Sequence, residues 1–195
     1  QLAIVWDASG SGAARDHERE FEMLDAYFAA LGRVDVTLVV ARDRAEASRT
    51  FTVTGGDWSA LRAALASVAY DGASNVAAWT VPADVSPGVT LLFSDGLGNW
   101  GDPHIAESRS PLYAISASTG ADANVLRALA ERSAGGGRYL DLLRLDASTA
   151  AAELRLVRPG IRVLPSPGLA DVVVTSRFAE QGRLRVVGRV TRADA

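Results

Sequence analysis

Residues 2–11, LAIVWDASGS, change from an apolar run to a polar loop within a few positions, and this change is the first indication of the fold. Residues 2–6 are continuously apolar, which is typical of a short strand buried on both faces of a sheet. Asp7 follows this run at once, and a Gly- and Ser-rich loop follows Asp7. Beyond the loop, apolar residues recur every three or four positions, which predicts an amphipathic helix over about 13–31 that Gly32 ends. A strand, a loop and a helix in this order indicate an α/β fold.

The same alternation of strand-like and helix-like segments continues along the chain. Further strands are expected at 34–41, 49–54, 89–93, 112–116 and 138–142. Further helices are expected at 58–68, 122–133 and 148–156, with Asp57, and either Asp122 or Asn124, as candidate N-caps. Apolar and polar residues alternate over 49–54, which indicates an edge strand paired with 34–41. This pattern predicts a doubly wound, mostly parallel, Rossmann-like sheet flanked by helices.

The composition narrows the possible classes of function. The chain has 195 residues, of which 48% are hydrophobic and 22% charged, as in an ordinary globular protein. The absence of Cys excludes a thiolate metal site and a cysteine nucleophile. All 20 basic residues are Arg, and the absence of Lys excludes a Walker P-loop and a Schiff-base enzyme. The net charge of −3 argues against nucleic-acid binding, and no apolar run is long enough for membrane insertion.

Residues 161–195 differ in character from residues 1–160. Two β-type runs, 170–178 and 183–191, predict a C-terminal β-hairpin appendage. Two strands rarely stand alone, so we expect this segment to pack on the α/β body or on an adjoining β domain. The chain also begins inside a strand-like run and without Met, which we interpret as a segment of a larger protein.

Polar side chains occur in three loops that should meet at one edge of the predicted sheet. In open α/β sheets, ligands bind beyond the carboxyl ends of the strands. The loops there supply two carboxylates and three hydroxyls: Asp7, Ser9, Ser11, Ser74 and Asp95. All are hard oxygen donors, so the set suits Mg²⁺ (or Mn²⁺ or Ca²⁺) and not Zn²⁺. One coordination position should stay open, and an Asp or Glu carboxylate of a partner protein is the natural ligand for it.

Three features of these loops resemble the metal-ion-dependent adhesion site of von Willebrand factor type A (vWA) domains: Asp7-x-Ser9-x-Ser11, Ser74 in a Gly-x-Ser-Asn loop, and Asp95-Gly96. The resemblance covers about residues 1–160. It implies a vWA fold in which the five residues hold a divalent cation that captures an acidic group of a protein ligand. Ser74 stands where the family usually has Thr, a difference that keeps the oxygen but loses the methyl that restricts the rotamer.

The tail is similar to the β segment that follows this domain in bacterial proteins with an upstream vault/inter-α-trypsin-inhibitor (VIT) domain. This resemblance implies that residues 161–195 contact a β domain that precedes Gln1 in the parent protein. Adhesive members of the family are expected in the cell envelope or outside the cell, whereas cytoplasmic relatives act in the assembly of complexes. The compartment therefore stays open.

Other residues near these loops have two interpretations each. Trp100 lies in a Gly-rich loop near the open metal position, where it is either an aromatic anchor for a partner or packs back on the domain. Asn75 is a second candidate ligand-binding residue, and it either orients Ser74 through a hydrogen bond or only shapes the turn. Ser94 is expected to be structural, and His17 is expected to face solvent.

Three other functions compete with cation-dependent protein binding. A dinucleotide-binding enzyme is suggested by Gly10-Ser11-Gly12, but Arg15 occupies the position where close helix packing needs Gly or Ala. A phosphatase of the haloacid-dehalogenase type would need Asp at position 9 and a Lys, and the chain has neither. A vWA scaffold that binds proteins without a metal remains the main alternative. We therefore predict a binding module and not an enzyme.

Overall fold

The computed structural model describes residues 1–101, 107–156, 169–174 and 186–191, and the chain divides into two units, Gln1–Leu156 and Val157–Ala195. In the first unit, six strands form one sheet in the order β3-β2-β1-β4-β5-β6. Their bounds are Leu2–Asp7 (β1), Arg33–Ala41 (β2), Arg49–Thr54 (β3), Val89–Phe93 (β4), Leu112–Ser116 (β5) and Arg138–Asp141 (β6). All neighbours are parallel except β2 and β3, which are antiparallel. The predicted mostly parallel sheet and its antiparallel edge strand are confirmed.

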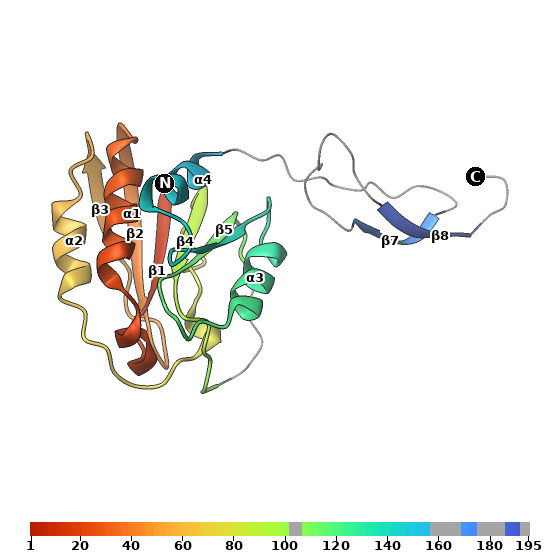
Figure 1. Ribbon diagram of the computed structural model, residues 1–195, viewed down its shortest axis with the longest axis horizontal. Coiled ribbons are helices and arrows are strands. Elements are labelled where there is room, and N and C mark those ends of the chain that lie inside the picture. The colour runs from red at the N-terminus through yellow and green to blue at the C-terminus, as the bar shows by residue number, and fades with distance from the viewer. Residues whose placement is uncertain (102–106, 157–168, 175–185, 192–195) are drawn as a thin grey trace. The chain divides into compact units, whose positions relative to one another are not determined.

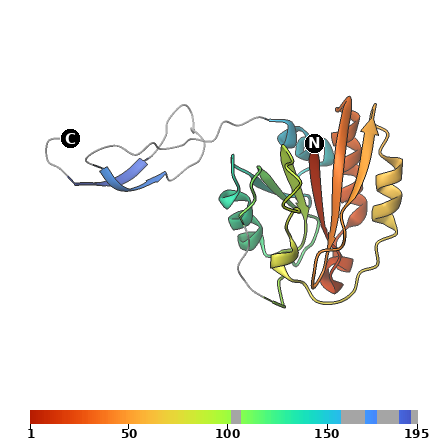
Figure 2. The same cartoon turned by 180° about the vertical axis from the view of Figure 1, so that it is seen from behind.

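Helices cover both faces of this sheet, as the doubly wound prediction requires. The helices are α1 (His17–Ala29), α2 (Ser59–Ala66), α3 (Ala123–Arg132) and α4 (Ala147–Arg155), with short 3₁₀ turns η1 (Gly10–Ala14) and η2 (Val76–Ala78). Figures 1 and 2 show α1 in front of β1 and β2 in one view and behind them in the other. Trp6 packs into the core that contains α1, α2 and α4, and Val5 packs into the core that contains α3 and η2. Successive residues of β1 thus serve opposite faces.

The first helix starts later than the sequence predicted. Residues 10–14 form a 3₁₀ turn, and α1 begins at His17 instead of about residue 13. Asp16 is the N-cap, because its carboxylate accepts a hydrogen bond from the backbone N–H of Arg19 at 3.2 Å. Between the turn and this cap, Arg15 has an extended backbone with φ −72° and ψ 148°. The apolar periodicity after residue 20 was interpreted correctly, but it carries no information on where the helix begins.

The N-caps of the other helices agree in part with the candidates predicted from the sequence. Asp122 caps α3 through bonds from the backbone N–H groups of Asn124 and Val125, as one of the two expected candidates. Asp57 accepts from the N–H of Ser59 but stands before the N-cap position, which Trp58 occupies. The helix predicted from residue 148 begins at Ala147, with Asp146 as its N-cap.

The second unit contains an antiparallel pair of strands, β7 (Leu169–Val174) and β8 (Val186–Val190). These strands fall within the two β-type runs predicted at 170–178 and 183–191, except for Leu169, one residue before the first. The remaining residues of both runs lie outside the described residues. In the described part of the chain, no helix has the length and apolar character needed to cross a bilayer.

Candidate metal-binding site

The predicted site lies where the connections of the sheet reverse direction. β1 is central: the chain passes from it to β2 on one side and later returns to β4 on the other side. In the register of the sheet, Trp6 stands opposite Phe93 of β4, and Asp7 stands opposite Ala41 of β2. The carboxyl ends of β1 and β4, at the lower edge in Figure 1, therefore place Asp7 near the loop that starts at Ser94. Such switch points are where open α/β sheets bind ligands.

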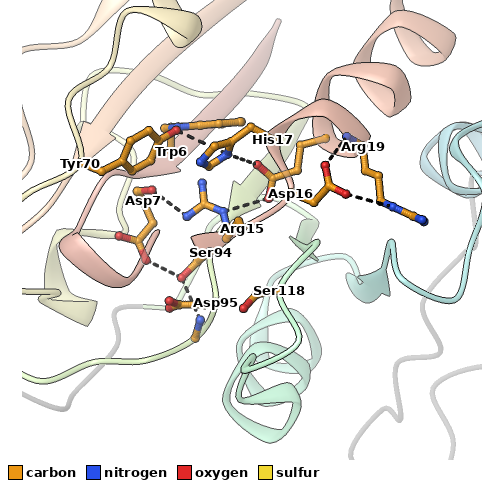
Figure 3. Close-up of polar contacts among 12 residues, drawn as sticks. Trp6, Asp7, Arg15, Asp16, His17, Arg19, Tyr70, Ser94, Asp95 and Ser118 are labelled. Carbon is orange, nitrogen blue, oxygen red and sulfur yellow. Dashed lines mark hydrogen bonds and ion pairs between the residues drawn. The ribbon is translucent and has the colours of Figure 1, made fainter. Parts of the chain in front are cut away.

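Hydrogen bonds connect the three loops at this edge to one another. The N–H of Gly10 in the first loop donates to the carbonyl of Gly72 in the second loop at 3.1 Å. The Oγ of Ser94 in the third loop donates to Oδ2 of Asp7 in the first at 2.7 Å, as Figure 3 shows. The N–H of Trp100 donates to the carbonyl of Ser74 at 3.1 Å, which connects the third loop to the second. The structure thus brings together the loops that carry the predicted residues.

The first loop folds tightly around the Asp7 carboxylate. Oδ1 of Asp7 accepts a hydrogen bond from the N–H of Ser9 at 3.0 Å, and the hydroxyls of Ser9 and Ser11 lie 3.3 Å apart. Asp7 and Ser9 are fully buried, whereas Ser11 is half-buried in the 3₁₀ turn. The Asp-x-Ser-x-Ser motif therefore places the Asp7 carboxylate against the backbone of Ser9, and it brings the hydroxyls of Ser9 and Ser11 close to each other.

Ser74 of the second loop holds a buried hydroxyl with no hydrogen-bond partner among the described residues. Its backbone is fixed, because its N–H donates to Oδ1 of Asn99 at 2.9 Å and its carbonyl accepts from the N–H of Asn99 at 3.0 Å. A buried hydroxyl without a partner carries a desolvation cost of about 1–3 kcal/mol. This oxygen is therefore available to a ligand.

The two carboxylates of the site are buried without a compensating cationic side chain. Asp7 and Asp95 are both almost fully buried, and neither forms an ion pair with any residue that the structure describes. Asp95 accepts a hydrogen bond from the N–H of Leu97 at 2.9 Å. The described residues also contain no group of three or more His, Cys, Asp or Glu side chains placed to hold a metal. Two carboxylates with hydroxyls fit a hard divalent cation, which would balance the buried charge.

For Trp100 and Asn75, the structure favours one of the two interpretations in each case. Trp100 is 65% exposed, so it does not pack back on the domain. Asn75 does not bond to Ser74: it accepts from the N–H of Ala77 and donates to the carbonyl of Asp43, so it shapes the turn. Neighbouring Asp71 pairs with Arg42 at 2.8 Å.

The structure agrees with the expectation for Ser94 and disagrees with the expectation for His17. Ser94 is structural, as predicted, since it links Asp7 to the N–H of Gly96. The expectation for His17 was wrong: its Nδ1 lies 2.9 Å from Oε2 of buried Glu20, and its ring stacks on Tyr70 at 4.6 Å between centroids. The late start of α1 turns this residue inward. Asn99 was missed because nothing in the sequence pairs it with a loop 25 residues earlier.

No protein-family model matches the chain, and no curated protein matches it. Solved structures do match. An aerotolerance-related membrane protein from Bacteroides fragilis is 11% identical, with TM-score 0.56 over 79% of this chain and 96% of that chain. The conserved hypothetical protein BatB from Bacteroides thetaiotaomicron is 11% identical, with TM-score 0.52 over 78% of this chain and 94% of that chain. A von Willebrand factor type A protein from Catenulispora acidiphila is 18% identical, with TM-score 0.50 over 89% of this chain but 44% of that chain.

These similarities establish the fold. The mixed sheet of mostly parallel strands with helices on both faces is a vWA-like α/β fold, as the motif resemblance implied. At identities of 11–18%, the comparison does not extend to ligands or partners.

Proposed function

We propose that the unit Gln1–Leu156 is a protein-binding module that depends on a divalent cation, Mg²⁺ or a similar ion. The cation would be held by the five oxygen-bearing side chains: Asp7, Ser9, Ser11, Ser74 and Asp95. The observation that carries this proposal is the buried Ser74 hydroxyl without a partner among the described residues, in a loop hydrogen-bonded to the loop that follows Asp95, together with two buried carboxylates without a counter-charge. One divalent cation would satisfy all three groups at once.

The bound cation would act as a Lewis acid that attracts a carboxylate of the partner. Asp7 and Asp95 supply two negative charges, so the loaded site is close to neutral and retains affinity for a further anionic ligand. The protein's part is to fix the loops before the cation arrives: Ser94 orients Asp7, and Asn99 fixes the backbone of Ser74. Groups that orient metal ligands in this way affect metal affinity strongly.

The loop after β4 also exposes two large apolar side chains close in sequence to Asp95. Trp100 and Leu97 are both exposed, and they lie five and two residues after Asp95. Exposed Trp is enriched among the residues that dominate binding energy at interfaces. The partner segment that suits these residues carries an Asp or Glu with an apolar residue close to it.

The backbone of the first loop is less suited to a dinucleotide. The N–H of Gly10 is bonded to the carbonyl of Gly72, and the N–H of Gly12 is bonded to the carbonyl of Ser9 at 2.9 Å. A pyrophosphate site needs such amides to face the ligand. The enzyme alternative therefore gains no support from the loop.

Isothermal titration with Mg²⁺ and with Mn²⁺ tests the proposal. We expect saturable binding to the wild-type protein and none to Asp7→Ala, with near-UV circular dichroism showing that the variant is folded. Asp84→Ala, at an exposed loop position, is the matched control and should bind as the wild type does. Flat traces for the wild type with both ions would overturn cation dependence and favour the metal-independent scaffold.

A further inference from the structure

A buried cationic side chain lies directly behind the proposed metal loop. Arg15 connects η1 to α1, and its side chain is fully buried. Its Nη1 donates to the backbone carbonyl of Asp7 at 2.8 Å, and its Nε donates to Oε1 of Glu20 at 2.9 Å (Figure 3). Its guanidinium lies over the ring of Trp6, 5.2 Å from the centroid. Arg15 thus contacts the last two residues of β1 and the first turns of α1.

The Arg15–Glu20 pair belongs to a network that reaches the second loop. Glu20 is fully buried, and its other oxygen, Oε2, accepts from Nδ1 of His17. The ring of His17 stacks on Tyr70, whose hydroxyl accepts from Nε1 of Trp6 at 2.8 Å. Burial is the main cause of the raised pKa of Tyr70, so this hydroxyl stays neutral. Tyr70 stands four residues before Ser74, so the network spans the starts of two of the three loops.

The first loop is shaped around this guanidinium. A Cβ added at Gly12 would lie 2.9 Å from Nη1 of Arg15 and 2.9 Å from the carbonyl oxygen of Asp7. Side chains do not tolerate such distances to a backbone atom, so the absence of a side chain at Gly12 allows the loop to close over the Arg15–Asp7 contact. The second loop joins at the same place, because the N–H of Asp71 donates to the carbonyl of Ala8 at 3.1 Å.

We propose that Arg15, neutralised by Glu20, is the positioning residue of the cation site. This inference rests on the proposed function. Arg15 fixes the backbone of Asp7 and the closure of the loop, while Glu20 cancels a positive charge that would otherwise repel the incoming cation. A buried ion pair contributes little net stability compared with apolar residues of similar size, so geometry and charge balance explain its presence better than stability does.

Two conservative variants test this role. Arg15→Lys keeps the charge but cannot donate to Asp7 and Glu20 in the same planar, forked geometry. Glu20→Gln keeps the shape but leaves the charge of Arg15 without its counter-charge. We expect both variants to bind Mn²⁺ with a Kd raised about 10- to 100-fold in isothermal titration. Arg62→Lys, at an exposed ion pair between α2 and Asp25 of α1, is the matched control and should keep the wild-type Kd.

A second measurement does not depend on the metal. Hydrogen exchange without divalent ions should be faster at the amides of residues 8–12 in Arg15→Lys than in the wild type, and unchanged in Arg62→Lys. Folded Arg15→Lys and Glu20→Gln proteins with the wild-type Kd would overturn the inference, while cation binding by the wild type would leave the proposed function intact. Loss of the folded state in both variants would also overturn it, since the pair would then be a requirement of folding. A wild type that binds no Mn²⁺ would instead defeat the proposed function itself.

Discussion

The hydroxyl of Ser94 donates to Oδ2 of Asp7 at 2.7 Å, and this buried contact joins the carboxyl ends of β4 and β1 across the switch point of the sheet. Ser94→Ala removes this donor and the acceptor used by the N–H of Gly96. We expect a loss of about 1–3 kcal/mol in the free energy of unfolding without metal, because a buried carboxylate loses a partner. Urea unfolding measures this loss.

Ser110→Ala, which breaks a buried contact with Thr90, is the control. Ser110→Ala should leave the affinity for Mg²⁺ unchanged, whereas Ser94→Ala should weaken it.

Ser74→Ala should weaken Mg²⁺ binding without destabilising the metal-free protein. The hydroxyl of Ser74 makes no hydrogen bond with the described residues, so its removal should not lower the free energy of unfolding without metal and should raise it by up to about 1–3 kcal/mol, because a buried unpaired hydroxyl is lost. The affinity for Mg²⁺ should still fall, because one oxygen ligand is lost. Urea unfolding and isothermal titration on the same preparation separate the two effects. An unchanged Mg²⁺ Kd would remove Ser74 from the proposed ligand set.

Asp95→Asn tests the charge of the site. Without metal, the variant should be at least as stable as the wild type, because a neutral amide replaces a buried carboxylate and can still accept from the N–H of Leu97. Mg²⁺ at about 100 times its Kd should stabilise the wild type by about 2.7 kcal/mol and leave the variant unchanged. Thermal unfolding with Mg²⁺ or with EDTA measures both effects. Equal stabilisation of the two proteins would show that Asp95 is not a ligand.

Trp100→Ala should affect partner binding alone. The side chain is largely exposed, and its backbone N–H, which bonds to Ser74, is retained in the variant. Peptides selected from a random displayed library on the Mg²⁺-loaded protein, and released with EDTA, provide the probe. We expect these peptides to contain Asp or Glu and to bind Trp100→Ala at least tenfold more weakly, about 1.4 kcal/mol. Leu156→Ala, at an exposed position away from the loops, is the control. Equal binding to both variants would exclude Trp100 from the contact.

Asp146 should make the stability of α4 depend on pH. Hydrogen bonds from Ser148, and then from Thr149, hold the pKa of this exposed carboxyl far below its usual range. A carboxyl with a lowered pKa in the folded state stabilises the protein above its unfolded pKa of about 3.9, and this contribution is lost as the pH falls toward the folded value. The melting temperature of Asp146→Ala should therefore be below that of the wild type at neutral pH, and the difference should shrink in acid. A difference that stays constant down to about pH 2 would contradict this account. Asp84→Ala serves as the control.

Much of the fold could be predicted because buried parallel strands leave a clear pattern. The apolar runs at 2–6 and 89–93 correspond to β1 and β4, and the alternating run at 49–54 corresponds to the antiparallel edge strand. The meeting of Asp7 with the loop after β4 also follows from the topology, because parallel strands end at the same edge. These predictions depend only on the periods of strands and helices.

The supporting contacts of the site could not be predicted in the same way. Arg15 lies in a segment with good helix formers before it, and periodicity does not show that the chain turns there and buries a guanidinium. Asp16 is a residue type that favours the N-cap position, and the predicted start at about residue 13 took no account of it. The contact between Asn99 and Ser74 depends on the path of two loops, and single residues in loops carry no period.

One short piece of chain carries both Asp95 and Trp100, and Asn99 between them holds Ser74. Under the proposed function, ion binding and partner binding would both use this segment, so the two equilibria would be linked. If the bound ion raises the affinity for the partner by some factor, the bound partner must raise the affinity for the ion by the same factor. A complex of this kind would dissociate when the ion is removed. At a low ion concentration, the protein would keep its bound ion best where the partner is abundant.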